Sequence, residues 1–345
     1  MNIQNQGVNN IKKKINTKKE RADQKQKGKK DKVLSIGELV VEFFIRESGH
    51  RFDEPGNEYI GPFASGAPAI FIDTVGKLGL DCGFIGTVGD DDFGKVITDR
   101  LKRDSVDISR IKILNNVATG TAFTTYFNDG SRKYLYHIKE CAPGRFGDDL
   151  LDEEYINKFT YLHISGNVLL FSECVKKACL KAVDMVLKNN GRITFDPNVR
   201  IEILNEETAK EANSLFFNMI KKAFIFFPSR GEIEAISGIG SEKEAVKYFF
   251  NNTELEYIAV KKGADGSTIY TRKKHMDIQT SDKGLVKVDP TGAGDCYCGG
   301  FLYGIIKGWD IYKVGDFANQ IGRKTVSVLG PMEGDFSEIL KRFNE

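Results

Sequence analysis

Short apolar runs alternate with amphipathic segments along most of this sequence. The apolar runs, each predicted to be a buried strand, lie at 33–44, 82–89, 161–166, 192–198, 223–229 and 257–263. Segments typical of helices lie between them, at 66–79, 91–104, 172–189, 206–222, 230–237 and 241–252. Strands that are apolar throughout and separated by helices favour a parallel sheet covered on both faces. The pattern therefore predicts an α/β fold.

Residues 119–138 break this rhythm. They alternate with a period of two around Asn128-Asp129-Gly130, which predicts a β-hairpin with a glycine turn. A hairpin of this kind usually packs outside the main sheet of an α/β chain. We therefore expect a lid, formed from about 43–62 and 117–140.

Positive charge is concentrated at the N-terminus. Residues 1–32 contain ten lysines and one arginine against three acidic residues, whereas the whole chain has a net charge of +2. Because this segment has almost no apolar side chains after Ile15, we expect a disordered basic tail, with a weak tether to RNA or anionic lipid as the alternative. The remainder, 33–345, is mildly acidic, which argues against a specific nucleic-acid partner.

Neither a membrane partner nor a disulfide framework is expected. No apolar run approaches the roughly 18 residues that a membrane span needs, and the basic N-terminus is not followed by the apolar region of a signal peptide. The six cysteines show no CxxC pair and no disulfide-dense spacing. We expect reduced thiols and a cytoplasmic protein.

The segment Asp289-Pro-Thr-Gly-Ala-Gly-Asp295 carries the most specific chemistry. A glycine turn that leads into a helix exposes unpaired N–H groups at the positive end of the helix dipole, which favours an anion. Asp295 would repel that anion, but it fits a general base for an attacking hydroxyl. The two features together suit phosphoryl transfer to an alcohol. The alternative is an ordinary helix start that Thr291 or Asp295 caps.

Two other phosphate motifs, GxxxxGK[ST] and GxGxxG after the first strand, do not occur. From about Val33 onward the chain instead resembles the ribokinase-like (PfkB) family of carbohydrate kinases. The matching motifs, in family order, are Gly37-Glu38, the stretch from Ser65 to Gly94, Asp196-Pro-Asn-Val-Arg200, Val260 to Gly266 and Asp289 to Asp295. The resemblance implies a kinase domain over 33–345 with a ribokinase-like three-layer α/β/α fold, a mostly parallel central sheet and a small β-hairpin lid.

The resemblance also implies an ATP-dependent phosphotransferase. Asp295 would be the catalytic base and would contact the sugar, and the N–H groups of Gly292, Ala293 and Gly294 would form the anion hole. The other implied sugar contacts are Glu42, Gly66 and Arg200, although Arg200 also fits a structural ion pair.

Cofactor residues follow from the same resemblance. Those implied for ATP are a turn with Gly263, Asp265 and Gly266, together with Asn319 and Gly322 beside the adenine. Glu232 matches a glutamate that helps to hold Mg²⁺, usually through water. Asp289 and Thr291 fall where members often bind K⁺; the alternative is that they only fix the loop.

Four positions depart from the family pattern. Ile70 stands where many members have a sugar-binding asparagine, Ser65 replaces a glycine, Glu42 replaces an aspartate, and Ser229 replaces the asparagine of the magnesium motif. The catalytic aspartate and its glycine turn are intact, so these departures concern the substrate rather than the reaction.

The strings GELVVEFF, IGPFASGAPAIFID and DPNVR look most like fructokinases and tagatose kinases. A 2-keto-3-deoxygluconate kinase is the nearest alternative, and its carboxylated substrate would favour a bidentate guanidinium. The lid strand at 121–126 has no arginine, although Arg132 and Arg200 remain available, so we expect a neutral ketohexose. A nucleoside kinase and a non-catalytic sugar sensor are further alternatives.

A homodimer is the expected assembly. In this family the lids of two chains often pair through their strands. Tyr126, Phe127, Tyr134 and Tyr136 would supply an apolar face on the lid.

Overall fold

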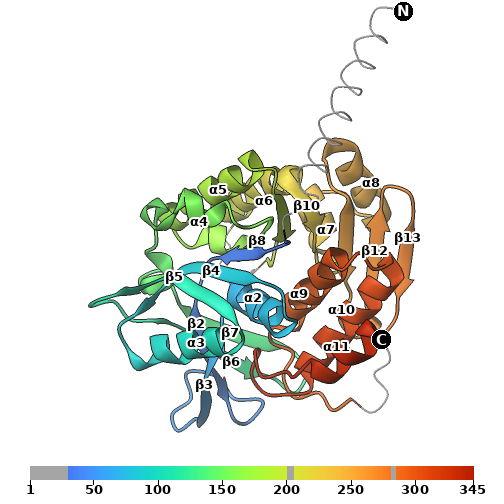
Figure 1. Ribbon diagram of the computed structural model, residues 1–345. Coiled ribbons are helices and arrows are strands. Elements are labelled where there is room, and N and C mark those ends of the chain that lie inside the picture. Colours follow the sequence, from blue (N-terminus) through green and yellow to red (C-terminus); the bar gives the residue numbers. More distant parts are fainter. Residues whose placement is uncertain (1–29, 200–205, 281–284) are drawn as a thin grey trace, which may run out of the picture. The chain divides into compact units, whose positions relative to one another are not determined.

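Two sheets, one large and one small, organise the part of the chain that the computed structural model describes, residues 30–199, 206–280 and 285–345 (Figure 1). Within these residues the large sheet has nine strands in the order β13-β12-β11-β10-β9-β8-β1-β4-β5. Its strands are β1 (Val33–Ile36), β4 (Cys82–Gly89), β5 (Val106–Leu114), β8 (Tyr161–Ser165), β9 (Arg192–Asp196), β10 (Ala223–Phe226), β11 (Tyr257–Lys261), β12 (Ser267–Thr271) and β13 (His275–Ile278).

The large sheet is mostly parallel, as predicted. Every pairing from β5 across to β11 is parallel, and only the β11–β12 and β12–β13 pairs are antiparallel. Six of its strands, β1, β4, β8, β9, β10 and β11, come from the apolar runs, because a strand covered on both faces needs apolar side chains on both.

Helices cover both faces of the large sheet and give the predicted three layers (Figure 1). One face packs against α2 (Ala67–Lys77), α3 (Asp92–Arg103), α9 (Ala293–Ile306), α10 (Ile311–Val326) and α11 (Ser337–Asn344). The other packs against α4 (Glu153–Ile156), α5 (Glu173–Lys188), α6 (Glu206–Lys222), α7 (Glu232–Ser237) and α8 (Glu242–Asn252). Short 3₁₀ turns are η1 (Ala142–Gly144), η2 (Asp148–Leu150), η3 (Gly166–Leu170) and η5 (Gly263–Asp265).

The small sheet, which we call the lid, has four strands in the order β3-β2-β6-β7 within the described residues. They are β2 (Val40–Ile45), β3 (Tyr59–Ser65), β6 (Gly120–Tyr126) and β7 (Arg132–His137). The predicted hairpin is the antiparallel β6–β7 pair, which closes between Tyr126 and Arg132. Strands β2 and β6 are parallel, so the two predicted parts of the lid join side by side.

The prediction of one strand over 33–44 is wrong. The chain leaves the large sheet after Ile36, where the Gly37 N–H donates to the Ile85 carbonyl, and it enters the lid at Val40. Most of β1 and β2 is buried, so the apolar run continues across the break. Hydrophobic pattern alone therefore cannot reveal the change of sheet.

The N-terminal prediction is largely untested. Nearly all of the predicted basic tail, residues 1–32, lies outside the described residues. Among the helices of the described ranges, none is both long and apolar enough to cross a membrane.

Candidate active site

A pocket of about 630 Å³ opens between the lid and the edge of the large sheet. Glu38, Asn167, Asp196, Ser229 and Lys261 line it, and each lies at or just after the carboxyl end of a parallel strand. Ligands of open α/β sheets bind at this edge, because loops from neighbouring strands converge there. The pocket therefore lies where the fold places a substrate site.

The predicted catalytic turn forms one wall of this pocket. Gly292 has a φ of 76°, and a Cβ added there would lie 2.7 Å from Pro331 Cβ, so the turn requires glycine. Helix α9 begins at Ala293, and the first N–H groups of a helix have no acceptor within it. Gly292, Ala293 and Gly294 all line the pocket, so these N–H groups lie beside the space that a ligand would fill.

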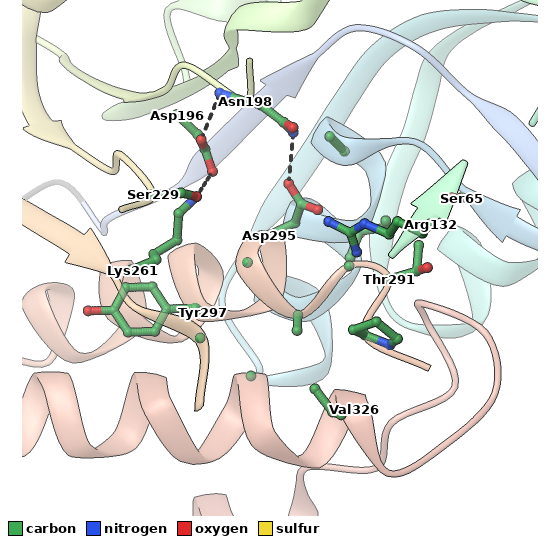
Figure 2. Close-up of a pocket in the computed structure, with 18 of the residues that line it drawn as sticks. Ser65, Arg132, Asp196, Asn198, Ser229, Lys261, Thr291, Asp295, Tyr297 and Val326 are labelled. Carbon is green, nitrogen blue, oxygen red and sulfur yellow. Dashed lines mark hydrogen bonds and ion pairs between the residues drawn. The ribbon is translucent and has the colours of Figure 1, made fainter. Parts of the chain in front are cut away.

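Asp295 lies in the first turn of α9 and lines the same pocket. It is only 6% exposed, and the Asn198 side-chain amide donates to its Oδ1 at 3.4 Å (Figure 2). A carboxylate thus lies directly behind the glycine turn and lines the same pocket, which is the arrangement that a general base for an acceptor hydroxyl needs.

Asp289 fixes the turn from behind and does not line the pocket. Its Oδ1 accepts from the Thr291 N–H at 2.9 Å and from the Tyr126 hydroxyl, and its Oδ2 accepts from the Gly330 N–H at 3.0 Å. Both oxygens are therefore already used within the protein, which fits the loop-fixing alternative. Thr291 lines the pocket, and a K⁺ ion at this pair of residues stays a prediction.

Two of the predicted sugar contacts line the lid side of the pocket. Glu42 is buried and accepts from the hydroxyls of Ser65 and Thr124, each at 2.7 Å. Gly66 passes the Glu38 backbone so closely that an added Cβ would lie 2.5 Å from the Glu38 carbonyl oxygen. The third, Arg200, lies outside the described residues.

The lid contributes three further side chains to the pocket. Arg132, Tyr134 and Tyr136 alternate along β7, and all three line the pocket. Together with Tyr126, whose hydroxyl bonds to the catalytic loop, these tyrosines face the body of the protein. These three of the four aromatic residues expected on an apolar lid face thus contribute to the pocket and the catalytic loop, and pairing of lids through that face stays a prediction.

At the far end of the pocket lie four of the five residues predicted to bind the nucleotide, namely Gly263, Gly266, Asn319 and Gly322. The Asn319 amide donates to the Ile278 carbonyl at 2.9 Å, which ties α10 to β13. Asp265 does not line the pocket; it is exposed and pairs with Arg230 at 2.6 Å.

Glu232 lines the pocket between these two ends. Its carboxylate accepts from the N–H groups of Ser229 and Val199, at 2.6 Å and 2.8 Å. Burial raises the pKa of Glu232, and the negative charge of Asp196 raises it further. Both Glu232 oxygens thus already accept hydrogen bonds within the protein, so a contact to Mg²⁺ through water stays a prediction.

Glu38, Asn167 and Lys261 are among the pocket residues that were not predicted as site residues from the sequence. Glu38 Oε1 accepts from the Asn167 amide at 2.9 Å and from the Ala67 N–H at 3.0 Å. Lys261 forms an ion pair with Asp196 (Figure 2). Glu38 and Lys261 lie within motifs that resemble the family, and this was the sequence signal for them. Their partners, Asn167 and Asp196, lie far away in the sequence, so no local pattern indicates these contacts.

Comparison with known proteins agrees with this geometry. The family model described as pfkB family carbohydrate kinase matches residues 30–337. Fructokinase-1 of Zea mays is 28% identical over 275 residues, covering 80% of this chain and 83% of the relative. The 5-dehydro-2-deoxygluconokinase of Clostridium perfringens is 28% identical over 296 residues, covering 83% and 84%.

A solved structure is more similar. The Escherichia coli protein described as a Ribokinase II, in complex with ATP and Mg²⁺, is 37% identical, with a TM-score of 0.83. The match covers 91% of this chain and 99% of that one. The three-layer fold, the intact glycine turn with Asp295, and a family match along nearly the whole described chain agree: this chain belongs to the pfkB family of carbohydrate kinases and is an ATP-dependent phosphotransferase.

Proposed function

We propose that the chain transfers the γ-phosphoryl group of ATP to a hydroxyl of a small sugar, with Asp295 as the general base. One observation carries this assignment: the Asp295 carboxylate lines the pocket directly behind the N–H groups of Gly292, Ala293 and Gly294. A base and an anion hole in contact with one cavity are the two parts that this reaction needs.

Each group of pocket residues has its own role in the proposed phosphoryl transfer. Asp295 takes the proton from the acceptor hydroxyl as that oxygen attacks the phosphorus atom, and the glycine turn stabilises the charge on the phosphoryl oxygens. The glycines at 263 and 266, with Asn319 and Gly322, bind the nucleotide. Glu232 helps to hold Mg²⁺, which neutralises phosphate charge when bound. The lid closes over the sugar and excludes water, a competing acceptor.

For the acceptor we propose a neutral ketohexose, fructose or tagatose. Glu42 and Asp295 line the pocket with carboxylate oxygens that suit sugar hydroxyls, and Gly66 also lines it. The similarity to a plant fructokinase supports this class.

A 2-keto-3-deoxy sugar acid is the second candidate, and Arg132 is the observation that favours it. Its guanidinium points into the pocket that contains Asp295 (Figure 2). Among the described residues it forms no ion pair and only stacks on Tyr134, 5.3 Å from the ring centre. A guanidinium in a substrate pocket suits a substrate carboxylate, and a 5-dehydro-2-deoxygluconokinase is among the relatives.

The first test is ADP release with Mg-ATP and a panel of acceptors: fructose, tagatose, ribose, 2-keto-3-deoxygluconate, 5-dehydro-2-deoxygluconate and adenosine. We expect turnover of one ketohexose, and a kcat lowered by about 10²–10⁴-fold in Asp295→Asn with ATP binding retained. Turnover of adenosine alone would reassign the chain to the nucleoside kinases. If no acceptor in the panel caused ADP release although ATP still bound, the result would support the non-catalytic sugar sensor.

Arg132→Met separates the two sugar classes. If the substrate is a sugar acid, this variant loses a charged hydrogen bond and the KM for the acid rises at least about ten-fold. If the substrate is a neutral ketohexose, its KM changes little. Arg132→Lys is the matched control, since it keeps the charge but not the bidentate geometry.

A further inference from the structure

Lys261 places a buried positive charge beside the Gly292–Asp295 turn in the pocket. It ends β11, its side chain is 12% exposed, and it lines the pocket that contains Asp295. Its ammonium group pairs with Asp196, which is almost fully buried at the end of β9 (Figure 2). Because Lys261 lines the pocket, its exposed part faces the cavity.

The ammonium group lies next to the catalytic turn. A Cβ added to Gly294 would lie 3.6 Å from Lys261 Nζ, and no other side chain is nearer to that point. Gly294 is the second residue of α9, so its N–H is one of those without an acceptor in the helix. The lysine and the helix N-terminus therefore border the same part of the pocket with positive charge.

Lys261 has donor capacity left for a ligand. An ammonium group has three N–H donors, and Asp196 accepts from one of them. Among the described residues its other contact is Cys298 Sγ at 3.9 Å, and a thiol sulfur is a weak acceptor. Burial by itself lowers the pKa of Lys261, but Asp196, Cys298 and Glu232 outweigh it and raise the pKa, so the group stays charged at neutral pH.

We propose that Lys261 is a further catalytic residue, which donates a hydrogen bond to a non-bridging oxygen of the phosphoryl group while it transfers. This inference rests on the proposed phosphoryl transfer at the Gly292–Asp295 turn. In that step the bond from the acceptor oxygen to phosphorus forms as the bond to the ADP oxygen breaks. The acceptor proton goes to Asp295, and Lys261 keeps all of its protons. Asp196 then acts as a positioning residue that aims the ammonium group.

The competing explanation is a purely structural ion pair between Lys261 and Asp196. Removing one member of a buried pair leaves the other charge without compensation and destabilises the fold. Lys261→Met alone therefore cannot separate the two explanations. The double variant Lys261→Met/Asp196→Asn removes both charges, and Asp196→Asn alone keeps the lysine beside the same neutral partner.

We expect the double variant to recover the melting temperature that Lys261→Met loses, but not its activity. Its kcat should remain about 10²–10³-fold below that of Asp196→Asn, the loss typical of one donor to a transition-state charge. Lys222→Met, which breaks an exposed ion pair with Asp184, is the control for the substitution and should behave like the wild type. If the double variant turned over as fast as Asp196→Asn, the ion pair would be structural and the proposal wrong.

A binding measurement keeps this test independent of the acceptor. Calorimetry with Mg-ADP and aluminium fluoride, a mimic of the transferring phosphoryl group, needs no sugar turnover. We expect the double variant to bind Mg-ADP as tightly as Asp196→Asn does, and to lose at least about ten-fold in affinity when fluoride and aluminium are added. Equal affinities with the mimic would overturn the role of Lys261, even if no panel sugar were phosphorylated.

Discussion

At the scale of single residues, the buried carboxyl of Glu38 is the most unusual feature of the pocket. Its Oε1 accepts two hydrogen bonds, but its Oε2 has no partner among the described residues. Burial raises the pKa of Glu38 from 4.5 to about 7, and Asp295 adds a smaller contribution in the same direction. The folded state is therefore more stable with Glu38 protonated than with Glu38 ionised.

This pKa predicts how stability depends on pH. Because the pKa is higher in the folded protein, the contribution of Glu38 to stability is fully present below about pH 4.5 and is lost as the pH rises through 7. Glu38→Gln cannot ionise, so its free energy of unfolding relative to wild type should increase by roughly 2–3 kcal/mol between pH 5 and pH 8.

Urea unfolding of both proteins at the two pH values measures this difference. Glu140→Gln, an exposed glutamate, controls for the substitution itself. A constant offset between Glu38→Gln and wild type at both pH values would show that Glu38 ionises freely in the folded state.

At the scale of elements, one side chain connects the lid to the catalytic loop. The Tyr126 hydroxyl, at the end of β6, donates to Asp289 and lies 2.9 Å from Thr291 Oγ1. Asp289 in turn positions the turn that precedes α9. Lid position and loop geometry are therefore coupled through this contact.

Tyr126→Phe removes this contact and keeps the ring. A hydrogen bond to a carboxylate contributes about 1.5–3 kcal/mol, so the KM for the sugar should rise about ten-fold or more, with a smaller effect on ATP binding. Steady-state kinetics and amide exchange of β6 and β7 measure the two consequences. Tyr59→Phe, on the exposed part of β3, should leave both unchanged. An unchanged sugar KM in Tyr126→Phe would mean that the lid closes without this link.

At the scale of the whole molecule, the lid presents two edge strands, β3 and β7, within the described residues. Leu135 on β7 and Tyr59 on β3 are each 41% exposed. Unpaired edges with exposed apolar side chains favour pairing with a second chain. This supports the predicted homodimer through the lid strands.

Light scattering tests that assembly. We expect a mass of twice the 38.6 kDa chain at micromolar concentration. Leu135→Lys should shift the equilibrium toward the monomer, because a charge on an edge strand disfavours pairing. Since Leu135 alternates with the pocket residues Tyr134 and Tyr136 and points away from them, ATP binding should persist. A monomeric wild type would remove the dimer from consideration.

How far the sequence could predict this molecule depends on how local each feature is. Strand and helix alternation is a local pattern, and so is the glycine turn with Asp295; both were predictable. The break after Ile36 was not, because the apolar run continues through it. The ion pair between Lys261 and Asp196 could not be predicted either. The two residues lie on different strands, and the distance between residues along the sequence does not indicate which buried side chains meet. Arg132 was noted, but only the register of β7 directs it into the pocket.

The order of the pocket residues along the chain has a consequence for descent. Glu38, Glu42, Gly66 and Arg132 all precede residue 140, whereas Asp196, Glu232, Lys261 and the Gly292–Asp295 turn all follow residue 190. Under the proposed roles, and apart from the sugar contacts expected of Arg200 and Asp295, the first half of the gene encodes the choice of alcohol and the second half encodes the transfer. Mutation or recombination in the first half can thus produce a kinase for a new sugar that inherits its chemistry unchanged.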